Sequence, residues 1–376
     1  MNAAQMFWQT WGRRLLRTVA IALLLVPLSL TLSAAWWDTG DSPARRSQLA
    51  QGNAVTDPTA ILRNALPIEN KSVRLLQARL EDISEGLRSK RWSLVTRDVK
   101  EAALVLNYDR SKILASVPAD RQPQAETLLD QLSAGIVDLR ASADDRDKSA
   151  VWKSRREMLN AITTLEELMV TGFPFEVPAE YADLPQLKGR ATVKMITEKG
   201  DLYIVADGYN APVNAGNFID LVQRGFYDGL TFLPSQDYVL QTGDPPGEAV
   251  GFIDPDTGEY RAMPLEVKIA DEEQPIYSIT LENAGFYLAQ PALPFSAYGT
   301  VALARPGDDP NGGSSQFFFF LFDTELTPPG FNLLDGRYSV FGYVVEGKET
   351  LENLKVGDKI LSAEVVRGAE NLVQPS

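Results

Sequence analysis

The sequence predicts an α+β multidomain protein in which an N-terminal α-helical bundle precedes an antiparallel β-barrel capped by helices. Two patterns predict this fold class. Apolar residues recur at steps of three and four between about 59 and 170, as on one stripe of a helix, and they follow strand-like spacing after Ala191. The length of 376 residues is too great for one ordinary domain, so we expect two folded units.

The composition excludes several kinds of chemistry. The chain has no cysteine and no histidine, which removes disulfides, thiolate nucleophiles, zinc-thiolate sites and the commonest general base. We expect no metal site and no cofactor. The net charge of −14 is concentrated after residue 190. Because an acidic surface repels phosphate backbones, we expect no nucleic-acid binding, and the acidic coat is best explained by solvation.

Residues 1–35 have the layout of a signal peptide, with arginines before an apolar stretch over 19–32 and small residues at 33–35. The stretch is shorter than the about 20 residues that span a bilayer, so a retained anchor is the less favoured alternative. We expect export, and association with a membrane through partners only. The pair Arg13-Arg14 partly resembles a twin-arginine signal, which leaves the export route open. Residues 36–58 are predicted to be a solvated linker.

Residues 59–172 are predicted to form an antiparallel bundle of four or five helices. The first strong stripe consists of Val73, Leu76, Leu80, Ile83 and Leu87. Weaker or later stripes cover 94–114, 128–139 and 151–169, and a shorter piece covers 59–64. Two basic clusters, 88–91 and 153–156, are consistent with docking to acidic partners or with ordinary solvated charge, and the sequence does not choose. A proline-rich connector, 173–190, follows.

The barrel is predicted over 191–370, with a short tail over 371–376. It opens with strands at 191–196 and 201–205, joined by a turn at Lys199-Gly200. A helix over 213–222 then offers three apolar side chains to cover one barrel end, and a turn over 225–229 follows it. The three side chains are Phe218, Ile219 and Leu221.

Four blocks in this half resemble the cyclophilins, the peptidyl-prolyl isomerase family, and occur in that family's order. They are Gln241-Thr242-Gly243-Asp244, the strand 299–304, the segment 313–318 and the segment 334–342. The signal segment, the bundle, the block 251–255 and an insertion reaching Pro294 resemble one subgroup, the large multidomain cyclophilins of the thylakoid lumen. That resemblance implies a location in the lumen or in a cyanobacterial periplasm, and a role in assembling or maintaining photosystem II.

The resemblance also implies a groove that binds proline-containing or extended polypeptide segments. Its substrate-binding positions are Tyr238, Val239, Gln241, Ala304, Gln316, Phe318, Leu333, Leu334 and Tyr338. Of these, Leu333 takes the place of a rim tryptophan, and Tyr338 takes that of a pocket histidine. The family's catalytic arginine has no counterpart here, because both ways of aligning the segment put Pro234 at its position.

An isomerase lowers a rotational barrier of about 20 kcal/mol without forming a covalent bond, and the arginine favours the twisted amide. Since Pro234 offers neither charge nor a donor, we predict weak or absent isomerase activity. Arg305 lies at the pocket edge by the same resemblance. It is either a weak substitute for the arginine or, the favoured alternative, part of a rim ion pair with Asp308 or Asp309.

Three hypotheses for function follow. The leading one is a lumenal or periplasmic assembly chaperone, whose barrel binds proline-containing segments, possible clients being photosystem II subunits, and whose bundle docks on a membrane complex. The second is a working prolyl isomerase that assists the folding of exported proteins. The third is a non-catalytic interaction protein whose groove is masked by its own bundle.

Overall fold

The computed structural model describes residues 55–234, 238–255, 257–287, 289–322 and 332–375. The predicted signal peptide and most of the predicted linker lie outside these residues. Across the described part of the chain, no helix is long and apolar enough to cross a membrane. The predicted fold class is confirmed, since long helices occupy the first part of the described chain and antiparallel strands the second.

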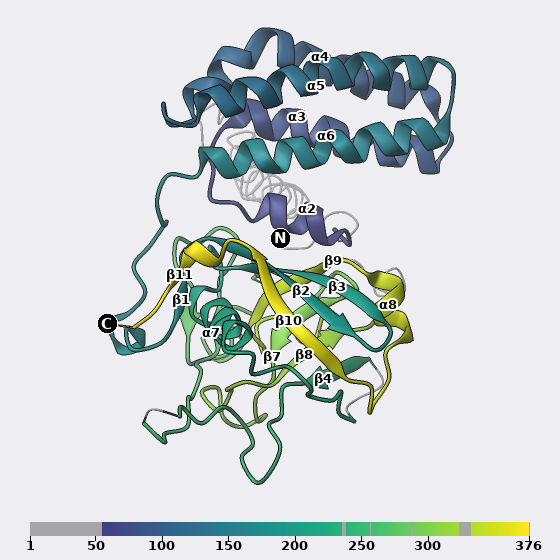
Figure 1. The fold of residues 1–376 in the computed structure, drawn as a ribbon. Coiled ribbons are helices and arrows are strands. Elements are labelled where there is room, and N and C mark those ends of the chain that lie inside the picture. Colours follow the sequence, from purple (N-terminus) through teal and green to yellow (C-terminus); the bar gives the residue numbers. More distant parts are fainter. Residues whose placement is uncertain (1–54, 235–237, 256, 288, 323–331, 376) are drawn as a thin grey trace, which may run out of the picture. The chain divides into compact units, whose positions relative to one another are not determined.

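Four long helices form the bundle and lie side by side (Figure 1). They are α3 (Lys71–Arg88), α4 (Trp92–Ala115), α5 (Gln122–Asp144) and α6 (Lys148–Met169). Their apolar stripes meet in one buried cluster, to which the predicted α3 stripe contributes all five members. Side-chain caps fix two of the starts, because the carboxamide of Asn70 accepts the Val73 N–H and the carboxylate of Asp147 accepts the Ala150 N–H.

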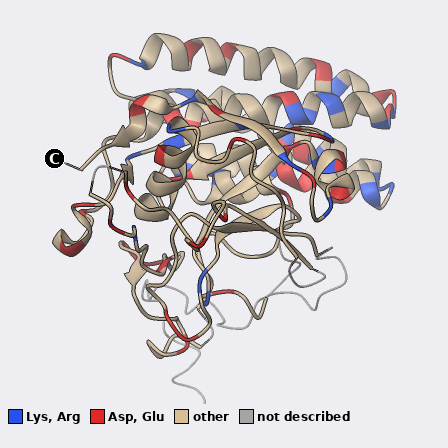
Figure 2. Cartoon of the chain, turned by 60° about the horizontal axis from the view of Figure 1, so that its bottom comes forward, with Lys and Arg blue, Asp and Glu red and all other residues tan. Residues whose placement is uncertain are grey.

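Lysines and arginines gather mainly on the helices, where acidic side chains are interspersed with them (Figure 2). Both predicted basic clusters are partly engaged within the bundle. Arg155 donates to the carbonyl of Leu80 at 2.8 Å, and Arg91 pairs with Glu85. The cations that these contacts leave exposed include Arg88, Lys90 and Arg156.

The short helix α2 (Pro58–Asn64), which the sequence predicts as a short piece over 59–64, packs its apolar side outside the buried cluster of the four long helices. Its start is fixed by Asp57, whose carboxylate accepts the Thr59 and Ala60 N–H groups. Ile61 and Leu62 are buried in an apolar cluster that otherwise consists of barrel side chains. The polar side of the helix contacts the bundle, because the buried Arg63 pairs with Glu81 at 3.3 Å.

The barrel is built from a seven-stranded sheet in the order β10-β2-β3-β9-β7-β8-β4, in which every ladder is antiparallel. The strands are β2 (Arg190–Thr197), β3 (Gly200–Asp207), β4 (Val239–Thr242), β7 (Thr300–Leu303), β8 (Phe317–Phe320), β9 (Val340–Glu346) and β10 (Ile360–Arg367). Two small sheets flank it, one of β1 (Gln186–Leu187) with β11 (Leu372–Val373), and one of β5 (Glu266–Val267) with β6 (Ile276–Tyr277).

The segment before β4 joins the two edges of this sheet. The Phe232 N–H donates to the carbonyl of Asp358 next to β10 at 3.0 Å, and the Leu233 N–H donates to the carbonyl of Gln241 in β4 at 2.8 Å. The sheet therefore has no free edge at this point, which removes a site for aberrant strand pairing.

Helix α7 (Pro212–Gln223) covers one end of the barrel, as the sequence predicts. The ring of Phe218 lies 5.3 Å from Phe317 and 5.1 Å from Phe341, measured between ring centroids. The carboxylate of Glu266 in β5 accepts the N–H groups of Val213 and Asn214 at the start of this helix. A negative charge is favourable there because the first N–H groups of a helix have no partner within it.

Glu166 in α6 is a buried carboxyl with one weak partner. Its Oε1 lies 3.4 Å from the guanidinium of Arg74, and its Oε2 has no hydrogen-bond partner among the described residues. Burial raises the pKa of Glu166 from 4.5 to about 7. Since the folded pKa exceeds the unfolded one, the free energy of unfolding should fall as pH rises from 4.5 to 7. At about 1.4 kcal/mol per pKa unit, this group's share of that fall is about 3 kcal/mol.

We expect Glu166→Gln to lose this contribution, so that its free energy of unfolding varies less between pH 5 and pH 8 than that of the parent protein. Urea unfolding at several pH values measures the difference. The exposed Glu157 on the same helix provides the control, because Glu157→Gln should retain the parent's pH profile. Superimposable profiles for Glu166→Gln and the parent protein would contradict the assignment.

Candidate functional site

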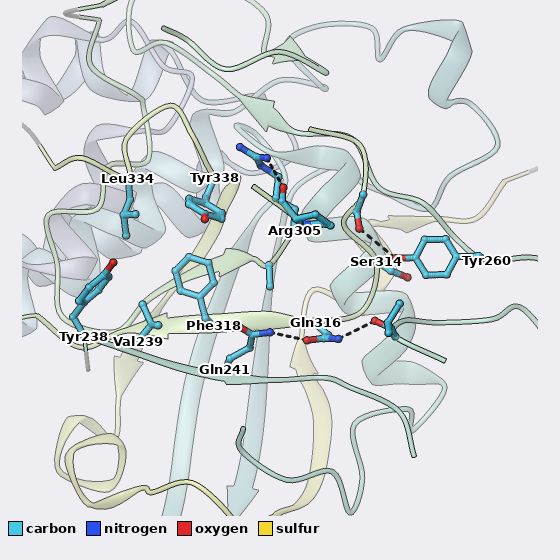
Figure 3. A pocket seen from close by; sticks show the side chains of 14 residues that line it. Tyr238, Val239, Gln241, Tyr260, Arg305, Ser314, Gln316, Phe318, Leu334 and Tyr338 are labelled. Carbon is cyan, nitrogen blue, oxygen red and sulfur yellow. Dashed lines mark hydrogen bonds between the residues drawn. The ribbon is translucent and has the colours of Figure 1, made fainter. Parts of the chain in front are cut away.

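A cavity of about 420 Å³ opens on the barrel, and we call it the groove. Of the residues that the sequence assigns to the site, all but Pro234 and Leu333 line it (Figure 3). The full lining consists of Tyr238, Val239, Gln241, Val250, Tyr260, Ala304, Arg305, Pro306, Gly312, Ser314, Gln316, Phe318, Leu334 and Tyr338. Residues from all four of the blocks that resemble the cyclophilins therefore converge on one cavity.

The apolar part of the groove is built on Phe318. Residues in β8 alternate between two apolar clusters, so that Phe318 and Phe320 point to the opposite side from Phe317 and Phe319. The ring of Tyr338 stands edge-on to Phe318, at 5.4 Å and 89°. Such a wall suits a compact apolar ring, because aromatic side chains supply a rigid apolar surface with a defined shape.

The loop that carries Leu334 and Tyr338 is fixed by the buried carboxyl of Asp335. This carboxyl accepts the N–H of Phe295 at 2.8 Å and the N–H of Asn332 at 3.2 Å. Burial raises the pKa of Asp335 from 3.8 to about 6, although both hydrogen bonds act in the opposite direction. These two hydrogen bonds therefore hold the loop at the rim of the groove in place.

Arg305 is held by backbone carbonyls. Its Nε and Nη2 donate to the carbonyl of Arg337 at 3.0 and 2.6 Å, and its Nη1 donates to the carbonyl of Pro306 at 2.8 Å. The guanidinium also lies 5.2 Å from the centre of the Tyr338 ring. The expected ion pair with Asp308 or Asp309 is replaced by a contact to the carbonyl of Asp309 at 3.3 Å, because the chain turns its backbone oxygens toward the guanidinium.

Two residues assigned to the site lie outside the groove lining. Pro234 is exposed and follows directly on Leu233, whose N–H pairs with β4. Leu333 is 85% exposed, although its neighbour Leu334 lines the groove. The residues that follow Pro234, 235–237, lie outside the described part of the chain.

Sequence reasoning missed five residues of the groove lining, which are Val250, Tyr260, Pro306, Gly312 and Ser314. Val250 and Tyr260 belong to an excursion between β4 and β5, and the Tyr260 hydroxyl donates to the carbonyl of Gly312 at 3.3 Å. The block 251–255 that marks the subgroup lies inside this excursion, and it was the available signal. No described residue of α2 to α6 lines the groove, so these helices give no support to masking by the bundle.

Sequence models of known protein families match both halves of the chain. Residues 192–369 match the sequence model of the "Cyclophilin type peptidyl-prolyl cis-trans isomerase/CLD" family. The chain belongs to the cyclophilin family. Residues 57–170 match the "Peptidyl-prolyl cis-trans isomerase CYP38-like, PsbQ-like domain", so this cyclophilin shares the two-part layout of the CYP38-like proteins.

Three relatives share this layout over most of the chain. A Synechocystis protein named "Putative thylakoid lumen peptidyl-prolyl cis-trans isomerase" is 61% identical over 363 residues, which cover 96% of each chain. The chloroplastic isomerase CYP38 of Arabidopsis thaliana is 46% identical, over 88% of this chain and 78% of its own. The chloroplastic isomerase CYP37 of the same plant is 34% identical, over 84% of this chain and 70% of its own.

Proposed function

We propose that this cyclophilin is exported to the thylakoid lumen, or to the periplasm, and acts there as a proline-binding chaperone or assembly factor with weak or absent isomerase activity. The observation that carries the proposal is the groove itself. Its apolar wall is intact, whereas the one cation that lines it among the described residues, Arg305, is bonded to carbonyls. Binding without efficient turnover is the behaviour that such a site supports.

The lumenal location is supported by the names of the Synechocystis and Arabidopsis relatives. For clients, we propose photosystem II subunits, on the strength of the resemblance to the lumenal subgroup. The bundle would dock on the membrane complex through cations such as Arg88 and Lys90, which are exposed. Affinity capture from photosynthetic membranes, with the full chain and with a variant that has both cations replaced by alanine, tests this part. Equal recovery of photosystem II subunits by both would contradict the docking role of the cluster.

Alanine substitutions of two adjacent leucines test whether the groove binds the peptide. Leu334 lines the groove, whereas Leu333 next to it is exposed and does not. We expect Leu334→Ala to weaken binding of a proline-containing peptide roughly 10-fold, since it removes apolar contact worth about 1 to 2 kcal/mol. Calorimetric titration of the full chain with an Ala-Pro peptide measures this.

Leu333→Ala is the matched control, and its affinity for the peptide should stay within about twofold of the parent's. Equal losses in the two variants would show that the peptide does not enter the groove. Failure of the parent protein to bind proline peptides at all would overturn the proposed function.

A further inference from the structure

A chain of three polar side chains runs from the outer loop into the groove. Gln241 Nε2 donates to Gln316 Oε1 at 2.6 Å (Figure 3). Gln316 Nε2 in turn donates to the carboxylate of Asp244 at 2.7 Å and to the carbonyl of Val250 at 2.8 Å. Asp244 lies three residues beyond Gln241 and does not itself line the groove.

The chemistry of the outer partners fixes the direction of this chain. An ionised carboxylate and a backbone carbonyl can only accept hydrogen bonds. Gln316 must therefore turn its nitrogen toward Asp244 and Val250, and both of its N–H groups are used there. The side-chain oxygen of Gln316 is then the atom that faces Gln241. Gln241 must therefore donate to it through its own side-chain nitrogen.

These hydrogen bonds determine which donor and which acceptor of the Gln241 side chain remain for a ligand. Gln241 uses one N–H on Gln316, and its Oε1 makes no hydrogen bond with any described residue. Since Gln241 lines the groove, it offers one acceptor and one further donor to a ligand. A donor beside an acceptor matches the N–H and C=O of an extended polypeptide backbone, but only while the amide keeps this orientation.

We propose that Asp244 is a positioning residue, which orients the Gln241 amide through Gln316 so that the groove is complementary to the backbone next to the bound proline. The proposal rests on the proposed function, because it assumes a polypeptide ligand. Asp244 is suited to this part because a hydrogen bond to an ionised acceptor is roughly twice as strong as one between neutral groups. Without the carboxylate, Gln316 keeps one fixed acceptor, Val250, and holds the Gln241 amide less firmly.

Asp244→Ala in the full chain is the first test. We expect its affinity for an Ala-Pro peptide to fall roughly 10-fold, in line with the loss of one ligand hydrogen bond. Asp244→Asn should lie between the parent and the alanine variant, because a carboxamide oxygen can still accept from Gln316. The exposed Glu248 in the same loop supplies the control, and Glu248→Ala should bind as the parent does.

A double-mutant cycle separates positioning from a general structural role. In a Gln241→Ala background, Asp244→Ala should cause no further loss of affinity, because the amide that it orients is gone. Additive losses would overturn the proposal, and so would parental affinity in Asp244→Ala. If Asp244→Ala failed to fold, Asp244→Asn would take its place in the cycle.

A second readout needs no ligand. The side-chain amide signals of Gln241 in an NMR spectrum should shift in Asp244→Ala and stay unchanged in Glu248→Ala. Unchanged Gln241 signals in Asp244→Ala would overturn the proposal. Since this measurement uses the unliganded protein, a parent chain that bound no proline peptide would overturn the proposed function while the orientation of Gln241 was still tested.

Discussion

The full chain should isomerise Ala-Pro and acidic-Pro peptides roughly 100- to 1000-fold more slowly than a cyclophilin that carries the family's arginine. This factor is the typical effect of removing one donor aimed at a charge that develops in the transition state, about 3 to 4 kcal/mol. Position 234 is an exposed proline outside the groove lining. A protease-coupled isomerase assay that compares kcat/KM of both proteins measures the difference.

Turnover comparable to that of the reference cyclophilin would contradict the prediction of slow isomerisation and favour the hypothesis of a working prolyl isomerase. Arg305 would then be the residue to examine. Its donors bind the carbonyls of Arg337 and Pro306, so we expect Arg305→Ala to leave the weak residual rate unchanged within about threefold. A complete loss of turnover in Arg305→Ala would instead identify Arg305 as a catalytic residue.

The helical part of the fold was predictable because the four long stripes are periodic, although the one over 94–114 is the weaker, and each coincides with a helix of the bundle. The exception is α2. A helix of seven residues carries too few apolar positions to show which core it joins. Ile61 and Leu62 fit the period of a bundle helix equally well, and only the tertiary structure places them against the barrel.

The groove was predictable as a set because its apolar residues stand inside recognisable blocks of the barrel sequence. Leu333 and Leu334 show the limit of this reasoning, since adjacent residues in a loop point in directions that the sequence does not encode. Val250 and Tyr260 could not be placed because the path of a long excursion depends on contacts distant in sequence. Tyr260, for example, is held by the carbonyl of Gly312.

Buried charges were the least predictable feature, because a charged residue reads as a surface residue until its partner is known. Arg190 and Asp207 face each other across β2 and β3, where the sequence shows only the two ends of a hairpin. Arg190 Nε and Nη2 donate to Asp207 Oδ2 at 3.0 and 2.6 Å. The side chain of Asp207 is fully buried, and that of Arg190 is 9% exposed.

Arg190→Ala should lower the free energy of unfolding by about 3 to 5 kcal/mol, because it leaves the carboxylate of Asp207 buried without its cation. The loss should also loosen α2 from the barrel, since Arg190 Nη2 donates to the carbonyl of Leu62 in that helix. Asn210 would keep its own bond to Asp207, but a carboxamide cannot replace a cation. Urea unfolding measures the stability, and hydrogen exchange of the α2 amides measures the loosening.

Lys194 on the same strand gives the matched control, because it pairs with Asp201 on the surface and Lys194→Ala should leave stability nearly unchanged. The double variant Arg190→Ala with Asp207→Ala distinguishes the cost of an unpaired charge from that of lost packing. If the unpaired carboxylate causes most of the loss, the double variant is more stable than Arg190→Ala alone. A double variant less stable than either single variant would show that packing around Arg190, rather than its charge, holds α2 on the barrel.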